Sequence, residues 1–468
     1  MSFNESRHSH APARAAGPRS ETDAEVHDLI GVGFGPSNLA IAIALRGLGD
    51  TGLSTHFVEK QPRFVWHGGM LLPGSDMQIS FLKDLALPRD PSSPFTFLAY
   101  LHEKGRLMDF INQKTFFPSR VEFNDYLGWA AERFASCVSY GEEVVALEPE
   151  VSGGAVDTVR VVSRGPEGRT RVRRARNLAL ATGGAPRVPE LFAPLREAAR
   201  VFHSSAYLAR IDGLGLERHP APRIAVVGAA QSAAEIFLDL TSRFPHGRVD
   251  MIVRGHALRP SDDTPFVNEI FHPEFTDFIF RQSEPRRRAL IADFKSTNYS
   301  VVDADLIDRI YAILYQQRVT GDERHQVRRL TTVTQARVSR DEAAGAADAG
   351  AIVLDLSIGP DGVAGRETYD AVVLATGYGR DGGRALLSGI EPYVTIGAVG
   401  RDYRLASVPE FHPAVFIQGT NEGSHGLSDT LLSVLAGRGQ EIADALIAAC
   451  AAAEVRGEAR VLRQAARM

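Results

Sequence analysis

The sequence predicts an α/β fold with two Rossmann-like nucleotide-binding domains and a small, mainly helical substrate-binding region. Three observations support this fold class. A short apolar run, a glycine-containing turn and a helix-like run follow one another at Gly31, and again at Gly228, 197 residues later. A second apolar run follows each helix-like run, which completes the order of a mononucleotide-binding unit. Each unit is followed later by an Ala-Thr-Gly motif, at 181–183 and at 375–377.

The composition is that of an ordinary globular protein. The chain has 468 residues, enough for two or three domains, and 44% of them are hydrophobic. The net charge of −5 comes from well-mixed acids and bases, so neither nucleic acid nor a membrane is an expected partner. Cys137 and Cys450 form no CxxC pair, so no redox disulfide and no metal site is expected. The absence of an apolar signal segment and this cysteine usage favour a cytoplasmic protein.

The order of the patterns predicts the domain boundaries. The Ala-Thr-Gly motif at 375–377 and the segment after it are expected to complete the first nucleotide-binding domain, so that the second domain is inserted into the first. The expected divisions are a disordered tail (1–25), a first nucleotide-binding domain (26–205 and 370–448), a second nucleotide-binding domain (206–255 and 325–369), a substrate-binding region (256–324) and a C-terminal helix or tail (449–468).

The first turn has the features of a dinucleotide site. Gly31 permits a tight turn, and Gly33 removes a Cβ that would collide with phosphates. Glu59 ends the next apolar run, where its carboxylate can accept hydrogen bonds from ribose hydroxyls. A glycine turn alone can be a packing device, but the strand, spacing and acid together favour FAD or NAD. The further expected cofactor-binding residues are Gly35, Pro36, Ser37 and Lys60.

The second turn is less regular. After Gly228, Ala229 and Ala230 stand where glycines are expected, so a structural turn is the alternative interpretation. The next apolar run ends in Arg254, a base that can pair with a 2′-phosphate, and this favours NADPH. Arg254 could otherwise be a surface charge. The residues that begin the helix and are expected to contact the nicotinamide cofactor are Gln231, Ser232, which could instead cap the helix, and Glu235.

Several irregular blocks carry a more specific resemblance. They include GVGFGPSNLA, MQISFLKDL, FFPSRVEFNDYL, RPSDDTPFVNEIF, TNYSVV and HGLSDTLLS. In this order, over residues 26–440, the sequence resembles the flavin-dependent N-hydroxylating monooxygenases, which hydroxylate side-chain amines of ornithine or lysine for siderophores. FINQKTFFPSRVEFNDYL and DDTPFVNEIF resemble the ornithine branch. Ala230 departs from the family, whose members usually carry glycine there.

The resemblance implies an activity and its cofactors. It implies FAD- and NADPH-dependent hydroxylation of the side-chain amine of L-ornithine by O2, through a C4a-hydroperoxyflavin. The alternative substrates are L-lysine and a diamine such as putrescine or cadaverine. It also implies a homo-oligomer, commonly a tetramer. Because the cofactor supplies the difficult chemistry, no nucleophile or triad is needed in the sequence.

The resemblance further implies residue roles. Gln78 and Lys83 would lie beside the flavin and the substrate, and Lys83 would pair with the substrate α-carboxylate. Asn268 would hold this carboxylate, and Asn298 the terminal amine. A surface role for Lys83, and turn or capping roles for the asparagines, are the alternatives. Ser428 and Leu427 would line the flavin–substrate junction. The remaining expected cofactor contacts are Trp66, His67, Met77, Thr376, Gly377 and Tyr378.

Two other classes of protein share parts of this pattern. A disulfide-reductase-like enzyme has the same two-nucleotide fold, but the missing CxxC opposes it. A non-catalytic flavin-binding sensor would need neither the second nucleotide unit nor Lys83 and its asparagines.

Overall fold

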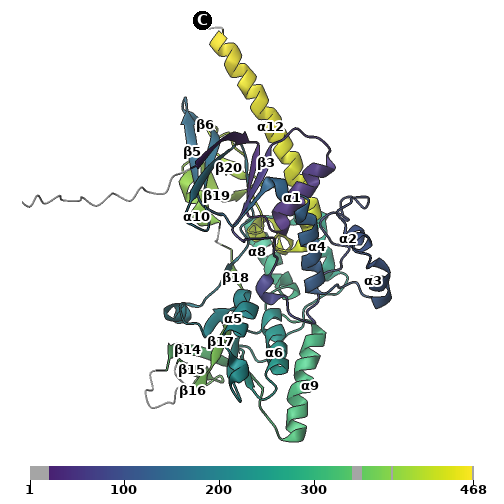
Figure 1. The fold of residues 1–468 in the computed structure, drawn as a ribbon, viewed down its shortest axis with the longest axis vertical. Coiled ribbons are helices and arrows are strands. Elements are labelled where there is room, and N and C mark those ends of the chain that lie inside the picture. Colours follow the sequence, from purple (N-terminus) through teal and green to yellow (C-terminus); the bar gives the residue numbers. More distant parts are fainter. Residues whose placement is uncertain (1–20, 340–349, 381–382, 466–468) are drawn as a thin grey trace, which may run out of the picture.

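The computed structural model describes residues 21–339, 350–380 and 383–465 (Figure 1). A five-stranded parallel sheet of order β21-β8-β2-β3-β4 forms the centre of the first domain. Every residue of β2 and β8 is buried, as expected for a parallel sheet covered on both faces. The strands are β2 (Leu29–Val32), β3 (Thr55–Glu59), β4 (Val138–Tyr140), β8 (Leu178–Leu180) and β21 (Val415–Ile417).

A second five-stranded parallel sheet, of order β10-β17-β11-β12-β13, forms the centre of the second domain. Its strands are β10 (Val201–His203), β11 (Arg223–Val227), β12 (Arg248–Ile252), β13 (Gln326–Arg328) and β17 (Ala371–Leu374). This corrects two expected boundaries, at 205/206 and 369/370. Val372 of β17 pairs with Val201 on one side and Ala225 on the other, so β10 and β17 both belong to the second sheet.

Each domain also carries a smaller sheet. In the first domain β7 (Thr170–Ala175) pairs antiparallel with β6 (Ala155–Arg164), and β6 pairs antiparallel with β5 (Glu143–Ser152). Strand β1 (Glu21–His27) is added to β7 in parallel. Because β1 begins at Glu21, the expected tail 1–25 is too long; residues 1–20 lie outside the described residues. The second domain carries β14 (Thr331–Val338), β15 (Ile352–Ile358) and β16 (Val363–Tyr369).

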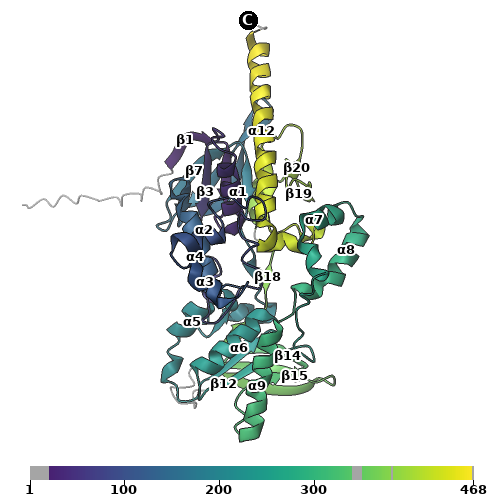
Figure 2. The same cartoon turned by 90° about the vertical axis from the view of Figure 1, so that its right-hand side faces the viewer.

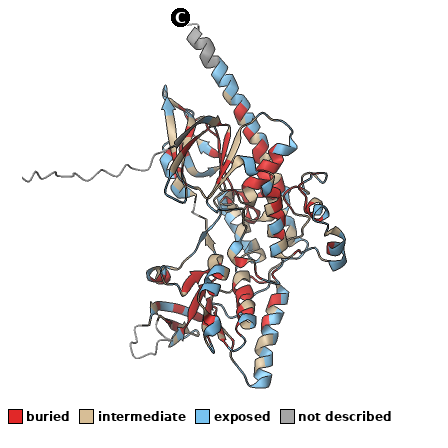
Figure 3. Cartoon of the chain, in the orientation of Figure 1, coloured by how far each residue is buried: buried red, intermediate tan, exposed pale blue. Residues whose placement is uncertain are grey.

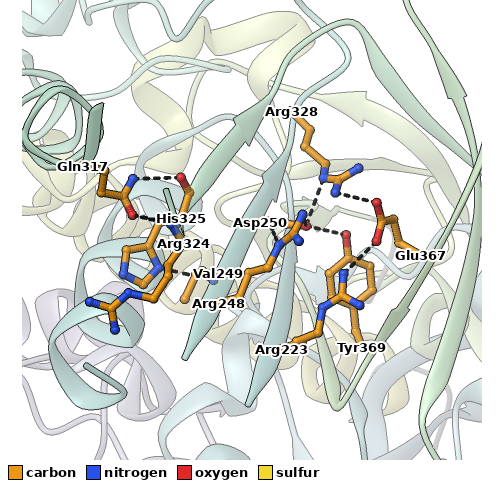
Figure 4. A network of polar contacts seen from close by, with 10 residues as sticks. All are labelled: Arg223, Arg248, Val249, Asp250, Gln317, Arg324, His325, Arg328, Glu367 and Tyr369. Carbon is orange, nitrogen blue, oxygen red and sulfur yellow. Dashed lines mark hydrogen bonds and ion pairs between the residues drawn. The ribbon is translucent and has the colours of Figure 1, made fainter. Parts of the chain in front are cut away.

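A buried charge network attaches the β14–β16 sheet to the second parallel sheet (Figure 4). Asp250 is fully buried in β12 and accepts hydrogen bonds from Arg248, Arg328 and the Tyr369 hydroxyl. Glu367 of β16 then pairs with both Arg328 and Arg223. A buried carboxylate is tolerated because it is paired and hydrogen-bonded.

Two helices in the first domain pack closely. The long helix α12 (Leu435–Ala465) lies against α1 (Pro36–Gly47), and its outer half extends beyond the domain (Figures 1 and 2). A Cβ on Gly439 would lie 2.8 Å from the backbone of Ala40, so glycine permits this approach. The aromatic segment after β3 forms α2 (Phe97–Glu103), α3 (Leu107–Gln113) and α4 (Arg120–Glu132).

The second domain and the substrate-binding region are covered by helices. Helices α5 (Tyr207–Gly213), α6 (Gln231–Arg243) and α9 (Ala304–Thr320) belong to the second domain. This corrects the expected substrate-binding region 256–324, because Leu306 and Ile310 of α9 are buried in the core of the second domain. The intervening segment forms η6 (Val267–Phe271), α7 (Pro273–Phe280), α8 (Glu284–Asp293) and η7 (Phe294–Thr297). Helices α7 and α8 contact α11 (Glu422–His425) of the first domain.

The two domains are connected by a short pair of antiparallel strands, β9 (Ala185–Pro186) and β18 (Tyr378–Gly379) (Figures 1 and 2). Buried residues concentrate in the sheets and in the helices that face them, whereas residues 451–458 of α12 are almost all exposed (Figure 3). Among the described residues, no helix combines the length and the apolar character that crossing a membrane requires.

Candidate cofactor and substrate site

The first glycine turn depends on two glycines that the structure makes irreplaceable. Gly33 has φ +85°, and a Cβ there would lie 2.5 Å from the carbonyl oxygen of Ala181. A Cβ on Gly31 would lie 2.2 Å from the Phe57 ring. The N–H of Gly33 donates to the Val58 carbonyl at 2.8 Å. The backbone of the turn therefore packs directly against β3 and against the end of β8.

Glu59 holds the same turn. One carboxylate oxygen accepts the Phe34 N–H at 2.7 Å, and the other accepts the Gln61 N–H at 2.8 Å. Each carboxylate oxygen has lone pairs to spare, so Glu59 can still accept hydrogen bonds from a ribose. Lys60, the next residue, is exposed.

Asn38 is a turn residue whose role the sequence did not reveal. It is fully buried, and its amide donates to the carbonyl oxygens of Gly33 at 2.6 Å and Ala179 at 3.2 Å. Its amide oxygen accepts from Gln418 at 2.9 Å. The sequence feature that could have predicted this role is a polar residue near the start of an otherwise apolar helix.

The first turn has the shape that a pyrophosphate requires. No heavy atom lies within 4 Å of a Cβ placed on Gly35, so space is open beside the turn. Pro36 is the first residue of α1, and Ser37 the second. The first N–H groups of a helix have no partner within the helix and carry its positive dipole end. The residues present therefore fit a dinucleotide phosphate.

The second turn repeats the first with different glycines. The Gly228 N–H donates to the Ile252 carbonyl at 3.2 Å, and a Cβ there would lie 2.3 Å from the Ala375 carbonyl oxygen. Gly228 is therefore the counterpart of Gly33. This corrects the expected alignment: the glycines are lost at Val226 and Ala230, not at Ala229 and Ala230, because both turns precede their helices by the same spacing.

Arg254 lies one residue beyond the position that Glu59 occupies in the first unit. Val58 is opposite Val32, and Ile252 is opposite Val227, so the sheet register makes Val253 the counterpart of Glu59. Arg254 is exposed, and no described carboxylate pairs with it. It remains available for an anionic ligand.

Gln231 and Glu235 take part in a polar cluster between the two domains, here called the junction cluster. Arg120 of α4 donates two hydrogen bonds to the carboxylate of Glu235, at 2.7 and 2.8 Å. Gln231 donates to Glu235 and to Asp303, and Gln78 donates to Asp303 at 3.0 Å. The cluster joins the expected flavin-side residue Gln78 to the first turns of α6. Arg120 was not among the expected site residues; as a base in the FFPSR block it was expected at most to form a salt bridge, which it does with Glu235.

The structure brings Lys83 to the segment that contains Asn268. The Lys83 Nζ lies 5.5 Å from the centre of the Phe271 ring, three residues after Asn268. Partial burial lowers the pKa of Lys83, and no carboxylate in the described part of the chain pairs with it. The Asn268 amide donates to the Asp263 carbonyl at 2.8 Å. An unpaired, half-buried cation is suited to an anionic ligand.

Asn298 lies on a segment that is fixed from two sides. Asp262 N–H donates to the Ser296 carbonyl at 3.2 Å, which connects this segment to the Asn268 loop. The hydroxyl of Tyr299 donates to Glu422 at 2.5 Å and accepts from Arg380. Glu422 begins the helix that precedes two further expected residues, the buried Leu427 and Ser428. The segments that contain Asn298, Asp262, Arg380 and Glu422 therefore meet here.

The other expected cofactor contacts surround the interdomain link. Trp66 packs edge-on against His67, whose ring in turn contacts Tyr378 of β18. The Gly377 carbonyl accepts a hydrogen bond from His203 at 2.9 Å, and Thr376 donates to the Arg187 carbonyl at 2.5 Å. Met77 is buried next to Gln78. Ser232 is the second residue of α6.

Two Rossmann-like domains, each with a glycine turn against a helix N-terminus, define a protein with two nucleotide-binding domains, so the predicted fold class is confirmed. The model of the L-lysine 6-monooxygenase/L-ornithine 5-monooxygenase family matches residues 25–380. The chain belongs to this family, which confirms the resemblance noted in the sequence.

Individual relatives are similar along most of their length. An L-ornithine N(5)-monooxygenase from Pseudomonas aeruginosa is 48% identical over 425 residues, covering 90% of this chain and 94% of the relative. A solved ornithine hydroxylase from Pseudomonas aeruginosa has a TM-score of 0.85 and 46% identity, covering 91% of this chain and 100% of that one. An ornithine N-hydroxylase from Kutzneria sp. 744, solved with reduced FAD, NADP+ and L-ornithine, has a TM-score of 0.82 and 37% identity, covering 90% and 99%. Structures of an L-lysine 6-monooxygenase and a cadaverine monooxygenase are 30% and 28% identical.

Proposed function

We propose that this protein is an FAD- and NADPH-dependent monooxygenase that hydroxylates the side-chain amine of L-ornithine, for the biosynthesis of a siderophore or a related product. The observation that carries the proposal is the unpaired, half-buried ammonium of Lys83 beside the Asn268 segment. An amino acid has a carboxylate for this cation, whereas a diamine does not. The higher identity to ornithine enzymes than to the lysine enzyme favours ornithine.

The two turns hold the two cofactors in this proposal. The turn of Gly31 and Gly33 would bind the FAD pyrophosphate, with Glu59 on the ribose. The turn of Gly228 would bind NADPH, with Arg254 on the 2′-phosphate. The open space beside Gly35, the free helix N–H groups and the unpaired Arg254 support these assignments.

The residues around the substrate would bind, orient and protect it. Bound, reduced FAD supplies the activated oxygen atom; the overall reaction converts amine, O2, NADPH and a proton into hydroxylamine, water and NADP+. Lys83 and Asn268 would fix the α-carboxylate. The side-chain amide oxygen of Asn298 would accept a hydrogen bond from the substrate amine. An amide stabilises the protonated amine less than a carboxylate would, so the amine can be neutral. The buried Leu427 and Ser428 would help to exclude water.

Product analysis tests this function directly. Purified holoenzyme is supplied with NADPH, O2 and, separately, ornithine, lysine, putrescine or cadaverine. We expect hydroxylated ornithine, with about one product for each NADPH consumed, and little product from the others. A different preferred amine would overturn the substrate, and a flavin that NADPH does not bleach under nitrogen would overturn the reaction.

The Lys83→Ala variant tests the carboxylate contact. We expect the KM for ornithine to rise roughly a hundredfold, which corresponds to about 2.7 kcal/mol, because a charged hydrogen-bonded contact is lost. Flavin reduction by NADPH under nitrogen should stay unchanged. Lys104→Ala, which removes an exposed lysine near Asp125, is the matched control. An unchanged KM for ornithine in Lys83→Ala would contradict the assignment.

We also propose a cytoplasmic location and a homo-tetramer. The location is supported by two cysteines that form no disulfide. The assembly is supported by the family resemblance, and the mass of the holoenzyme by light scattering tests it; a monomer would refute it.

A further inference from the structure

The close packing of α12 on α1 brings a buried arginine to the first glycine turn. Gly439 lets the backbone of α12 approach Ala40, one turn of α1 beyond Ser37. The preceding residue, Arg438, therefore reaches the start of α1. Its Nη2 donates to the Ser37 hydroxyl oxygen at 3.0 Å.

Arg438 has little solvent contact and is held by one acid. It is 3% exposed, and its Nη1 donates to the Asp429 carboxylate at 3.1 Å and to the Asp429 backbone carbonyl. Its Nε is buried without a partner. The guanidinium lies 5.9 Å from the centre of the Tyr403 ring. Because Asp429 is also buried and neutralises the charge, Arg438 acts on the turn through its hydrogen bond to Ser37 rather than through a net charge.

The direction of that hydrogen bond decides what Ser37 can do. A guanidinium has donors and no acceptor, so the Ser37 oxygen must accept from Arg438. The hydroxyl hydrogen then points elsewhere, and no acceptor for it is present in the described part of the chain. Ser37 is the second residue of α1 and is partly exposed beside the open space at Gly35. A phosphate oxygen bound at this place would accept a hydrogen bond from such a hydroxyl.

We propose that Arg438 is a positioning residue that fixes the Ser37 hydroxyl as a hydrogen-bond donor to the pyrophosphate of FAD. The inference rests on the proposed binding of FAD at the first turn. It gives α12, the last helix of the chain, a part in cofactor binding that neither the glycine motif nor Glu59 implies.

Titration of the apoprotein with FAD, followed by flavin fluorescence, tests this role without turnover. We expect Ser37→Ala to raise the Kd about tenfold, since a hydrogen bond to a charged group is lost. Ser37→Thr keeps the hydroxyl and should restore binding. Arg438→Met should raise the Kd by a similar factor, and the double variant should be no worse than the weaker-binding single variant. Gln440→Met on the same helix, which removes contacts to Arg89 and Asp444, is the matched control and should bind normally.

The outcomes separate the inference from the cofactor assignment. Wild-type apoprotein that does not bind FAD would overturn the proposed cofactor and, with it, this inference. Wild-type binding with an unchanged Kd in Ser37→Ala would overturn the inference alone. A double variant whose Kd rises by the product of the two single effects would show that Arg438 acts independently of Ser37, which also overturns it. Because Ser37→Ala keeps the buried Arg438–Asp429 pair, its result stands even if Arg438→Met fails to fold.

Discussion

The two glycine turns of this protein have the same backbone framework but are supported by different parts of the chain. Gly33 and Gly228 make equivalent contacts with the strand ends at Ala181 and Ala375. The first turn is supported entirely by its own domain, through Asn38, Glu59 and the Arg438–Asp429 pair. The second has lost the glycines at Val226 and Ala230.

The second turn is instead supported from across the interface. Its helix α6 carries Glu235, whose carboxylate is held by Arg120 of the first domain. Arg120 and Glu235 are 11% and 5% exposed, so this is a buried interdomain ion pair. The first site is therefore a property of one domain, whereas the second depends on how the two domains meet. Four predictions test this contrast.

Adding a Cβ to one turn at a time should affect only the cofactor that binds at that turn. Gly33→Ala forces alanine into φ +85° against the Ala181 carbonyl, and we expect FAD affinity to fall on the order of a thousandfold, about 4 kcal/mol. Gly228→Ala should keep FAD but lose reduction by NADPH, because its Cβ meets Ala375. Absorbance of the purified proteins and anaerobic reduction measure both effects. A flavin-free Gly228→Ala protein would refute the separation.

Removing the interdomain ion pair should damage the second site more than the first. Arg120→Met leaves the Glu235 carboxylate buried without its partner, which costs about 3 kcal/mol of unfolding free energy. Urea unfolding measures this loss, and anaerobic reduction should slow while FAD stays bound. Arg120→Met combined with Glu235→Gln should recover part of the stability. Equal loss of FAD and NADPH binding would contradict the contrast.

Acid should lower the free energy of unfolding through a buried histidine of the first domain. Burial lowers the pKa of His425, next to the Asp429 segment, to about 4, from 6.5. Between pH 6.5 and pH 4 the imidazole of His425 is protonated in the unfolded chain but stays neutral in the folded protein. The free energy of unfolding is therefore at its full value above pH 6.5 and falls as the pH is lowered towards 4. We expect His425→Gln to reduce the stability difference between pH 7.5 and pH 5 by about 2 kcal/mol. Urea unfolding at both values measures it; an identical pH dependence would refute it.

The smallest expected effect is on the choice of nicotinamide cofactor. Arg254→Gln should raise the KM for NADPH about tenfold, about 1.4 kcal/mol, and leave NADH nearly unaffected, since only NADPH has a 2′-phosphate. Anaerobic reduction by the two cofactors measures the ratio. Exposed Arg329→Gln, on the neighbouring strand end, is a matched control for the loss of positive charge. Equal effects of Arg254→Gln on both cofactors would indicate a general surface charge.

The sequence allowed the prediction of features that depend on neighbouring residues. Gly31, Gly33 and Glu59 belong to one local strand–turn–helix–strand unit, so their spacing carried the information. The supporting contacts join distant residues: Arg120 and Glu235 are 115 positions apart, Gln418 and Asn38 are 380 apart, and Arg438 and Ser37 are 401 apart. No periodicity signals such pairs. The boundaries at 205/206 and 369/370 failed for the same reason, because sheet membership is decided by pairing, not by local pattern.

The paired strands β9 and β18 bear on how the chain folds during synthesis. They mark where the chain leaves the first domain, near Pro186, and returns to it, near Tyr378. All strands of the second sheet lie between these points, whereas the first sheet needs β21, at Val415–Ile417. A ribosome therefore completes the inserted domain before the domain that began the chain. Until β21 is made, β8 remains at the edge of the first sheet without its second neighbour while the insertion folds, and an unpaired strand edge of this kind promotes aggregation.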